Sequence, residues 1–302
     1  MISLVVHGGA WDIPDELVDA HREGVRRAVK EAWGVLKSGG SAVDAVETAI
    51  MIMEDDETFD AGRGSFMNQS GEIELDASIM NGKTYRAGAV AAVRNVKNPI
   101  NLARKIMEQS DNVLLVGTGA TRFALEHGVK TCKPDDLVTV RELERWRDAH
   151  RQAHYSPKEV FSKKKVAADT VGAVALDSHG NIAAGTSTGG TPNKHPGRVS
   201  DSPLIGCGTY ADNHIGGVST TGWGEALITV VMAKTVIDLM DHNGGNPGAA
   251  VIDGIKILER KAEGLGGVIA LNASGKVGVA FNTPRMARGF MNSDMRAPVV
   301  AI

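Results

Sequence analysis

The chain has 302 residues, of which 42% are hydrophobic and 23% are charged, so it is long enough to bury a core without disulfides or a structural metal. The formal net charge is −3, and no basic stripe is interleaved with aromatic residues, which excludes a protein whose main partner is nucleic acid. No apolar run reaches the roughly 18 residues that a membrane-spanning helix needs, so we expect no membrane association.

The cysteine content points to a reducing compartment. Cys132 and Cys207 permit at most one disulfide, and neither has the spacing of a metal site or a redox motif. The first residues, ISLVV, are typical of a short strand rather than of a secretion signal. We therefore expect a cytoplasmic protein.

The N-terminal part is predicted to hold two helices. Residues 15–37 place apolar side chains at helical spacing, and this pattern stops at Gly39. Ser41 and Asp44 form the start signal of a second helix that continues to Met53. Two antiparallel helices result.

Strands and a further helix are expected next. Residues 72–80 and 87–95 are predicted to be neighbouring strands. Residues 98–109 follow as a helix with its proline near the first turn.

A polar segment then interrupts the pattern. No glycine occurs between Gly128 and Gly172, and residues 141–165 carry many charges and few apolar anchors. This composition predicts a frayed helix followed by a mobile linker, over about 141–169. Such a segment suits a chain that is cut at the end of the linker.

The C-terminal part returns to alternating strands and helices. We expect strands over 171–177 and 182–188, helices over 223–241 and 247–262, and a last hairpin over 267–281. Antiparallel strand pairs with paired helices predict an α+β fold, with two sheets packed face to face and helices on both outer sides. One domain over residues 1–302 is expected.

Thr170 is the most informative residue. It opens the strand TVGAVALD directly after the charge-dense segment that ends at Asp169. Cleavage between these two residues would give Thr170 a free α-amine, whose pKa of about 7.7 to 8.0 suits a base that activates the adjacent hydroxyl. The alternative is a threonine that only starts a strand. The first interpretation predicts a self-cleaving amidohydrolase.

Further polar residues lie where such a nucleophile needs partners. Thr188 ends the strand that pairs with the one Thr170 begins, so their hydroxyls are expected to meet. Thr221 and Gly222 precede a predicted helix and offer a hydroxyl and a backbone N–H to an oxyanion. These positions fit acyl transfer.

A pair of opposite charges suits an amino-acid substrate. Arg198 and Asp201 lie three residues apart in the loop GRVSDSP. The guanidinium can bind an α-carboxylate and the carboxylate an α-ammonium. The alternative for this pair is a surface ion pair.

These residues resemble a known family along nearly the whole chain. The sequence is similar to the plant-type L-asparaginases, also called isoaspartyl peptidases, among the N-terminal-nucleophile hydrolases. The motifs that carry the resemblance are VHGGA, GGSAVDAVE, EDD with FDAGRGS, LDASIMNG, TVGAVALD, TSTGG, GRVSDSP, YADN and STTGWGE.

The resemblance implies a fold and an activity. It implies a four-layer αββα sandwich that cuts itself into an α subunit, 1–169, and a β subunit, 170–302, and assembles as a dimer of the cleaved heterodimers. It implies hydrolysis of L-asparagine and of β-aspartyl dipeptides, with no cofactor for catalysis.

The resemblance also implies site residues. Thr170 is the nucleophile, and His7 lies in a glycine-rich turn that shapes the site. The remaining implied roles are hydroxyl partners at Thr188 and Thr221, an oxyanion donor at Gly222, substrate contacts from Arg198, Asp201, Thr221, Gly222, Gly224 and Asp60, and autocleavage positions at Gly9, Asp169 and Thr170. A structural Na⁺ is expected on backbone carbonyls of Met53, Glu54, Asp56, Phe59, Ala61 and Arg63.

Two positions depart from the family pattern. Asp60 stands where the family usually has an asparagine that faces the nucleophile, which puts the rate and the pH optimum in question. Asp169 stands where plant-type enzymes usually have glycine, and it resembles the glycosylasparaginases instead. Glycosylasparaginase is therefore kept as the alternative function.

An alternative of another class is nucleotide binding. Residues 113–124 form a strand-like run that enters a Gly-x-Gly turn, and Asp135 and Asp136 follow at a suitable distance. The third glycine of the dinucleotide motif is missing. A non-enzymatic protein of the same fold is the remaining alternative.

Overall fold

The computed structural model describes residues 1–151 and 169–302. The helices are α1 Asp15–Lys37, α2 Ala42–Glu54, α3 Pro99–Gln109, α4 Gly117–Glu126, the short η1 Pro134–Asp136, α5 Val140–Arg151, α7 Gly224–Thr229, α8 Met232–His242 and α9 Pro247–Ala262. The strands are β1 Ser3–Trp11, β2 Leu75–Asn81, β3 Ala87–Val93, β4 Leu114–Val116, β5 Val171–Leu176, β6 Ile182–Thr188, β7 Thr209–Asp212, β8 Gly216–Gly222, β9 Gly266–Asn272, β10 Val277–Phe281, β11 Arg285–Asn292 and β12 Val299–Ala301.

The strands form two sheets that pack face to face. The large sheet has the order β12-β11-β1-β5-β6-β2-β3-β4, and the small sheet has the order β10-β9-β8-β7. Neighbours pair antiparallel, except for the parallel pair of β3 and β4. Strands β1, β5 and β6 of the large sheet contact β8 and β9 of the small one.

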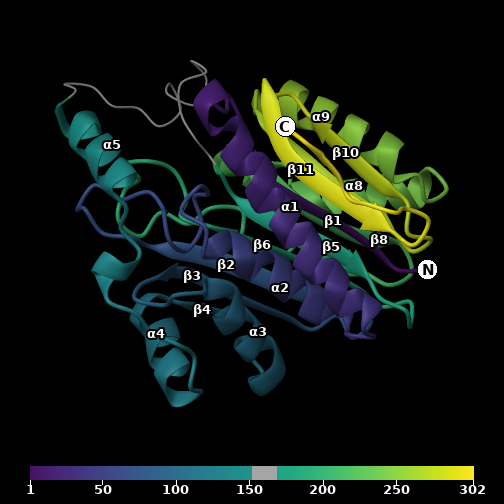
Figure 1. Cartoon of the computed structure of the whole chain (residues 1–302), viewed down its shortest axis with the longest axis horizontal. Coiled ribbons are helices and arrows are strands. Elements are labelled where there is room, and N and C mark those ends of the chain that lie inside the picture. The colour runs from purple at the N-terminus through teal and green to yellow at the C-terminus, as the bar shows by residue number, and fades with distance from the viewer. Residues whose placement is uncertain (152–168) are drawn as a thin grey trace.

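Helices cover both outer faces. In Figure 1, α1 and α2 lie across the large sheet, while α8 and α9 flank the small sheet. Buried apolar side chains gather in three layers: between the N-terminal helices and the large sheet, between the two sheets, and between the small sheet and α8 and α9. The predicted four-layer αββα sandwich is confirmed.

The signals at the start of α2 work as expected. The Ser41 hydroxyl accepts a hydrogen bond from the Asp44 backbone N–H, and the Asp44 carboxylate accepts one from the Ser41 N–H. This reciprocal cap satisfies two N–H groups that the first helical turn leaves free. The predicted helix over 15–37 has the bounds of α1.

The helix expected over 223–241 is broken. Helix α7 ends at Thr229, and Val231 adopts a left-handed φ of 49° before α8 begins. The N–H groups of Ala233 and Lys234 donate to the carbonyls of Cys207 and Gly206 instead of to a preceding helical turn. Contacts with a distant loop therefore override the local helical pattern.

The strands and the polar segment differ in detail. The strand expected from residue 72 begins at Leu75, and β11 and β12 were not predicted. Helix α5 is docked on the body, because the Trp146 indole donates to the carbonyl of Asn68 at 2.9 Å. The rest of the predicted linker, residues 152–168, lies outside the described residues.

Strands from before and after Thr170 alternate in the large sheet. Strand β1 lies between β11 and β5, and β2 pairs with β6. This interleaving brings the start of β5 beside the end of β6.

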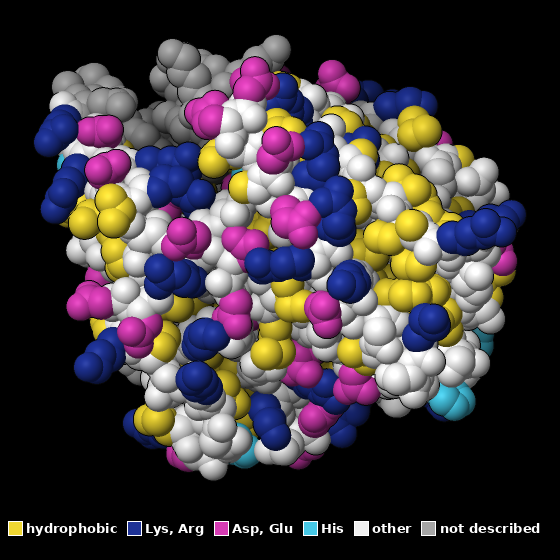
Figure 2. All heavy atoms as spheres, viewed as in Figure 1, with side chains coloured by type: hydrophobic (Ala, Val, Ile, Leu, Met, Phe, Trp, Pro, Cys, Tyr) yellow, Lys and Arg dark blue, Asp and Glu magenta, His cyan; other side chains and the backbone are white. Residues whose placement is uncertain are grey.

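The surface has mixed charge. The face seen in Figure 2 carries lysine, arginine, aspartate and glutamate side chains interspersed, rather than a basic stripe. Among the described residues, no helix is both long and apolar enough to cross a membrane.

Candidate active site

The hydroxyls of Thr170 and Thr188 meet at the edge where β5 begins and β6 ends. The antiparallel register pairs Val171 with Ser187, so the preceding and following residues face each other. The Thr170 Oγ1 donates a hydrogen bond to the Thr188 Oγ1 at 3.1 Å, and both side chains are buried. The structure therefore brings the predicted nucleophile and its predicted partner together.

A buried histidine fixes the main chain of Thr170. The Nδ1 of His7 lies 3.0 Å from the Thr170 carbonyl oxygen, and its Nε2 lies 2.9 Å from the Ser219 hydroxyl. Burial lowers the pKa of His7 to about 3, against the opposing effect of the Thr170 hydrogen bond, so the ring is neutral. Because a carbonyl only accepts, Nδ1 carries the proton and Nε2 accepts from Ser219. Gly9 follows at a strand irregularity with a φ of 94°, which favours glycine.

Asp169 is buried beside the nucleophile. Its carboxyl group accepts a hydrogen bond from the Trp11 indole and lies 3.2 Å from the His21 Nε2. Burial acts to lower the pKa of His21, but the charge and hydrogen bond of Asp169 raise it above the ordinary value. The uncleaved chain thus holds the residue before Thr170 by its side chain.

Arg198 is oriented by a partner that the sequence did not reveal. Its Nε and Nη2 donate to the two carboxylate oxygens of Glu225, each at 2.9 Å. This two-bond geometry fixes the guanidinium plane. The prediction of Arg198 as a ligand-binding cation did not include Glu225, because nothing in TGWGE indicates which basic residue it meets.

Asp201 lies close to Arg198. Its Oδ2 accepts from the Thr220 hydroxyl at 2.8 Å. Burial raises the pKa of Asp201 to about 7, while Thr220 and the Arg198 charge act in the opposite direction. A Cβ on Gly224 would lie 2.7 Å from the Arg198 Nη2 and 3.1 Å from the Asp201 Oδ1. A side chain at position 224 would therefore displace the guanidinium that Glu225 orients.

Thr221 and Gly222 end β8 next to this pair. Gly222 has a φ of 138°, and a Cβ there would lie 2.4 Å from the Gly266 Cα, so only glycine fits. Helix α7, which follows, has only 6 residues. The dipole of so short a helix contributes little at its N-terminus beside Gly222.

Asp60 presents a carboxyl group to the same region. Its Oδ1 accepts from the Phe66 N–H at 2.9 Å. Burial raises the pKa of Asp60 well above its ordinary value, the neighbouring charges of Glu142 and Asp169 add to the rise, and Lys194 opposes it. Burial therefore favours the protonated form of this carboxyl group, which stands where an asparagine is expected.

Three predicted site residues keep a buried polar atom without a hydrogen-bond partner among the described residues. These atoms are Arg198 Nη1, Thr221 Oγ1 and Asp60 Oδ2. A buried polar group without a partner costs about 1 to 3 kcal/mol. A polar ligand that binds among these residues would satisfy them.

Lys194 was missed by the sequence analysis. Its side chain is fully buried and its Nζ donates to the Glu74 carbonyl at 2.7 Å. Burial lowers the pKa of Lys194, although the Asp76 and Asp60 carboxyls act against this. Lysine is rarely buried, so the position of Lys194 in a glycine- and proline-rich loop gave no signal of burial.

The loop that is expected to bind Na⁺ is tightly folded. Three of the six carbonyls expected to bind it accept backbone hydrogen bonds, those of Met53, Glu54 and Asp56. A Cβ on Gly64 would lie 2.7 Å from the carbonyl oxygen of Glu57 and 3.0 Å from that of Phe59. The loop is therefore tightly folded, and half of the carbonyls expected to bind Na⁺ already accept a hydrogen bond.

The Glu54 side chain ties this loop to β6. Its Oε1 accepts from the Ser187 hydroxyl at 2.7 Å and from the Ile100 N–H at 3.1 Å. Burial raises the pKa of Glu54 to about 8, against these hydrogen bonds. The loop is thus anchored next to Thr188.

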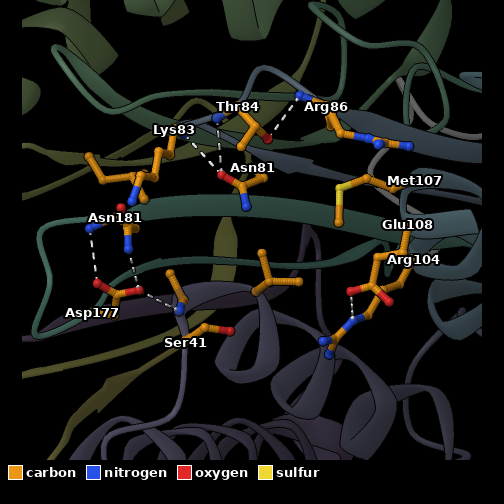
Figure 3. Close-up of a pocket in the computed structure, with 13 residues that line it drawn as sticks. Ser41, Asn81, Lys83, Thr84, Arg86, Arg104, Met107, Glu108, Asp177 and Asn181 are labelled. Carbon is orange, nitrogen blue, oxygen red and sulfur yellow. Dashed lines mark hydrogen bonds and ion pairs between the residues drawn. The ribbon is translucent and has the colours of Figure 1, made fainter.

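A pocket of about 350 Å³ lies at the opposite end of β5 and β6. Figure 3 shows Asp177 bonded to Asn181 on one side and Arg104 paired with Glu108 on the other. None of the predicted site residues lines this pocket. Nucleotide binding at the turn from Gly117 to Gly119 stays a prediction.

The chain resembles proteins of one family along its whole length. Residues 1–301 match the family model described as asparaginase. The isoaspartyl peptidase/L-asparaginase of Xenopus laevis is 43% identical over 291 residues, which cover 96% of this chain and 92% of that protein. The plant-type L-asparaginase of Pyrococcus horikoshii is 41% identical over 315 residues and matches 100% of both chains.

A third relative, the isoaspartyl peptidase/L-asparaginase of Danio rerio, is 42% identical over 284 residues, with 94% of this chain and 90% of that protein covered. These names do not favour the glycosylasparaginase alternative. Three findings point to the same family. They are the match of the family model to residues 1–301, the hydrogen bond between the Thr170 and Thr188 hydroxyls, and the closeness of Arg198 and Asp201. The chain is therefore a hydrolase that belongs to the asparaginase family.

Proposed function

We propose that this protein is an autoproteolytically activated amidohydrolase that converts L-asparagine to L-aspartate and ammonia and cleaves β-aspartyl dipeptides. The observation that carries the proposal is the 3.1 Å hydrogen bond between the Thr170 and Thr188 hydroxyls. It lies at the head of β5, directly after the buried Asp169. The free polar atoms of Arg198 and Thr221 supply the binding groups that such a substrate needs.

Maturation is the first stage. The Thr170 Oγ attacks the carbonyl carbon of Asp169, the peptide C–N bond breaks, and the Thr170 nitrogen takes up a proton to become an amine. Water then hydrolyses the ester, which leaves a carboxylate on Asp169 and restores the Thr170 hydroxyl. The products are the fragments 1–169 and 170–302.

Hydrolysis of substrate repeats this chemistry. The Thr170 amine accepts the proton of its own hydroxyl, and Oγ attacks the side-chain amide carbon of the substrate. Thr221 and Gly222 stabilise the resulting oxyanion. The C–N bond breaks and ammonia or an amino acid leaves with a proton. Water then releases L-aspartate from the ester.

The charged pair holds the α-amino-acid end of the substrate. The free Arg198 Nη1 binds the α-carboxylate, because Glu225 already occupies the other side of the guanidinium. Asp201 in its ionised form binds the α-ammonium group. Asp60 presents to the same site its Oδ2, which has no hydrogen-bond partner among the described residues.

We further propose how the protein assembles, where it is located and which ion it binds. The two fragments stay together as a heterodimer, and two heterodimers form a homodimer in the cytoplasm. A Na⁺ ion would be held by carbonyls of the 53–63 loop, where it fixes the loop that carries Asp60. This ion has a structural role, and catalysis needs no cofactor.

The intact mass of the denatured protein tests the proposal. After incubation at neutral pH, we expect two species that separate between Asp169 and Thr170, in place of one species of 31.8 kDa. Thr170→Ala should stay uncut and inactive, and scission of that variant would contradict the assignment. Ammonia release from asparagine, compared with hydrolysis of a β-aspartyl dipeptide and of a glycosylated asparagine, then ranks the substrates.

A further inference from the structure

We propose that His21, together with Trp11, is a positioning residue for maturation that holds the Asp169 side chain while the bond to Thr170 is cut. This inference rests on the proposed self-cleavage. It assigns a role to two side chains that the hydrolysis of substrate does not use. It also explains how the chain accommodates an aspartate at position 169.

The hydrogen bonds of His21 fix its proton. Its Nδ1 lies 2.8 Å from the Leu17 carbonyl oxygen, which can only accept, so Nδ1 carries a hydrogen. Its Nε2 lies 3.2 Å from the Asp169 Oδ2. If the ring were neutral, with its only proton on Nδ1, the lone pair of Nε2 would face a lone pair of the Asp169 Oδ2, which is repulsive. The contact is therefore a hydrogen bond when His21 is protonated and donates from Nε2, in line with the raised pKa of His21.

The second carboxyl oxygen of Asp169 is also bound. The Trp11 indole N–H donates to Oδ1, so both oxygens have a partner. The His21 ring is held edge to face by Trp11 at a centroid distance of 6.1 Å and by Phe59 at 5.3 Å. His21 is fully buried and Asp169 is only 3% exposed, so water does not replace these contacts.

Other carboxyl groups near Asp169 make its contacts with Trp11 and His21 necessary. The charges of Asp169 and Glu142 act on Asp60, and that of Asp169 acts on Glu142, so three carboxyl groups are close together. Arg141 is the cation that faces His21 from α5. Removing one partner of a buried charge is strongly destabilising. Without His21, the Asp169 side chain would leave this position.

Strand β1 anchors both sides of the bond that is cut. His7 holds the carbonyl of Thr170, which follows the bond, and Trp11 holds the side chain of Asp169, which precedes it. Both anchors belong to β1, and His21 in α1 adds the third contact. The peptide bond is thus fixed between two held residues, as attack at a defined angle requires.

A double-mutant cycle tests whether His21 acts through Asp169. The variants are His21→Ala, Asp169→Gly and the combination, and the measured quantity is the rate of scission at residue 169. We expect His21→Ala to slow scission at least tenfold in the parent chain and to change it less than twofold in Asp169→Gly, which has no side chain to hold. Equal slowing in both backgrounds, or none in the parent, overturns the inference.

A conservative variant separates positioning from general damage to the fold. His21→Gln offers a side-chain N–H to Asp169, so we expect it to recover most of the lost rate. Trp11→Phe keeps the ring but lacks the N–H, and we expect slower scission that again vanishes in Asp169→Gly. Melting temperatures are compared in a Thr170→Ala background, where no variant is cut. Failure of His21→Gln to exceed His21→Ala at equal melting temperature also overturns the inference.

The cleavage assay separates failure of the proposed self-cleavage from failure of the proposed role of His21. A parent chain that stays uncut contradicts the proposed maturation itself. A parent chain that is cut, with His21→Ala cut at the same rate, leaves the maturation intact and removes only the role of His21.

Discussion

Gly172 leaves the space into which the His7 imidazole fits. A Cβ at position 172 would lie 2.4 Å from the His7 Nε2 and 2.1 Å from the Ser219 Oγ, which are bonded to each other. Gly172 lies in β5, His7 in β1 and Ser219 in β8, so both sheets meet at this point. The other ring nitrogen of His7, Nδ1, holds the carbonyl of Thr170.

Gly172→Ala should therefore destabilise the protein and slow its maturation. Overpacking of this kind costs about 1 to 3 kcal/mol, and we expect a melting temperature lower by several degrees. Gly34→Ala is the matched control, because nothing lies within 4 Å of a Cβ there and the residue is inside α1. It should gain about 0.5 to 1 kcal/mol. Equal melting temperatures for the two variants would contradict the steric argument.

Thr188→Val should slow both scission and hydrolysis. Valine keeps the shape of the side chain but cannot accept from the Thr170 hydroxyl, nor from the Gly190 N–H that donates to the same oxygen at 3.0 Å. A lost hydrogen bond of about 1.4 kcal/mol corresponds to a tenfold lower rate, which single-turnover measurements would detect. Thr188→Ser retains the hydroxyl and should stay within a few-fold of the parent. A valine variant as fast as the serine variant would rule out this role.

Arg198→Lys should raise KM for asparagine more than it lowers kcat. A lysine cannot bond both oxygens of Glu225 and still present a fixed N–H to a carboxylate. We expect KM to rise about tenfold to a hundredfold, since hydrogen bonds to charged groups contribute about 1.5 to 3 kcal/mol. Glu225→Gln leaves the Arg198 guanidinium in the protein, so it should raise KM less than Arg198→Lys does. A change confined to kcat would exclude Arg198 as a binding group.

The pH dependence of kcat/KM should report Asp201. Burial raises its pKa to about 7, and the ionised form is the one that binds the α-ammonium group, so kcat/KM should increase as the pH rises through about 7. Thr220→Val removes a hydrogen bond that favours the carboxylate, so this increase should move to higher pH. Asp201→Asn should remove this increase and leave only the one that the Thr170 amine gives, at a pH of about 7.7 to 8.0. If Thr220→Val does not change the pH at which kcat/KM increases, the group that titrates there is not Asp201.

The predictable part of the site follows from local pattern. The hairpin signal around residues 178–181 sets the register of β5 and β6, and that register alone places Thr170 beside Thr188. The cap of α2 is equally local, because Ser41 and Asp44 are three residues apart.

The features that could not be predicted from the sequence depend on contacts between distant parts of the chain. Glu225 and Arg198 lie 27 residues apart, and His21 and Asp169 lie 148 apart, so no spacing rule could pair them. The break at Val231 has the same origin, since the competing carbonyls come from residues 206 and 207. Local propensity is overridden wherever such long-range hydrogen bonds are stronger.

The alternation of strands in the large sheet changes the molecularity of folding. Strand β1, which precedes Thr170, is hydrogen-bonded on both sides to strands that follow Thr170, so the two proposed fragments could not part without opening the sheet. Before scission, unfolding yields one polypeptide and its midpoint does not depend on protein concentration. After scission it yields two, and the midpoint should rise as the concentration is increased. The proposed cleavage that activates the enzyme would also make its refolding a second-order reaction.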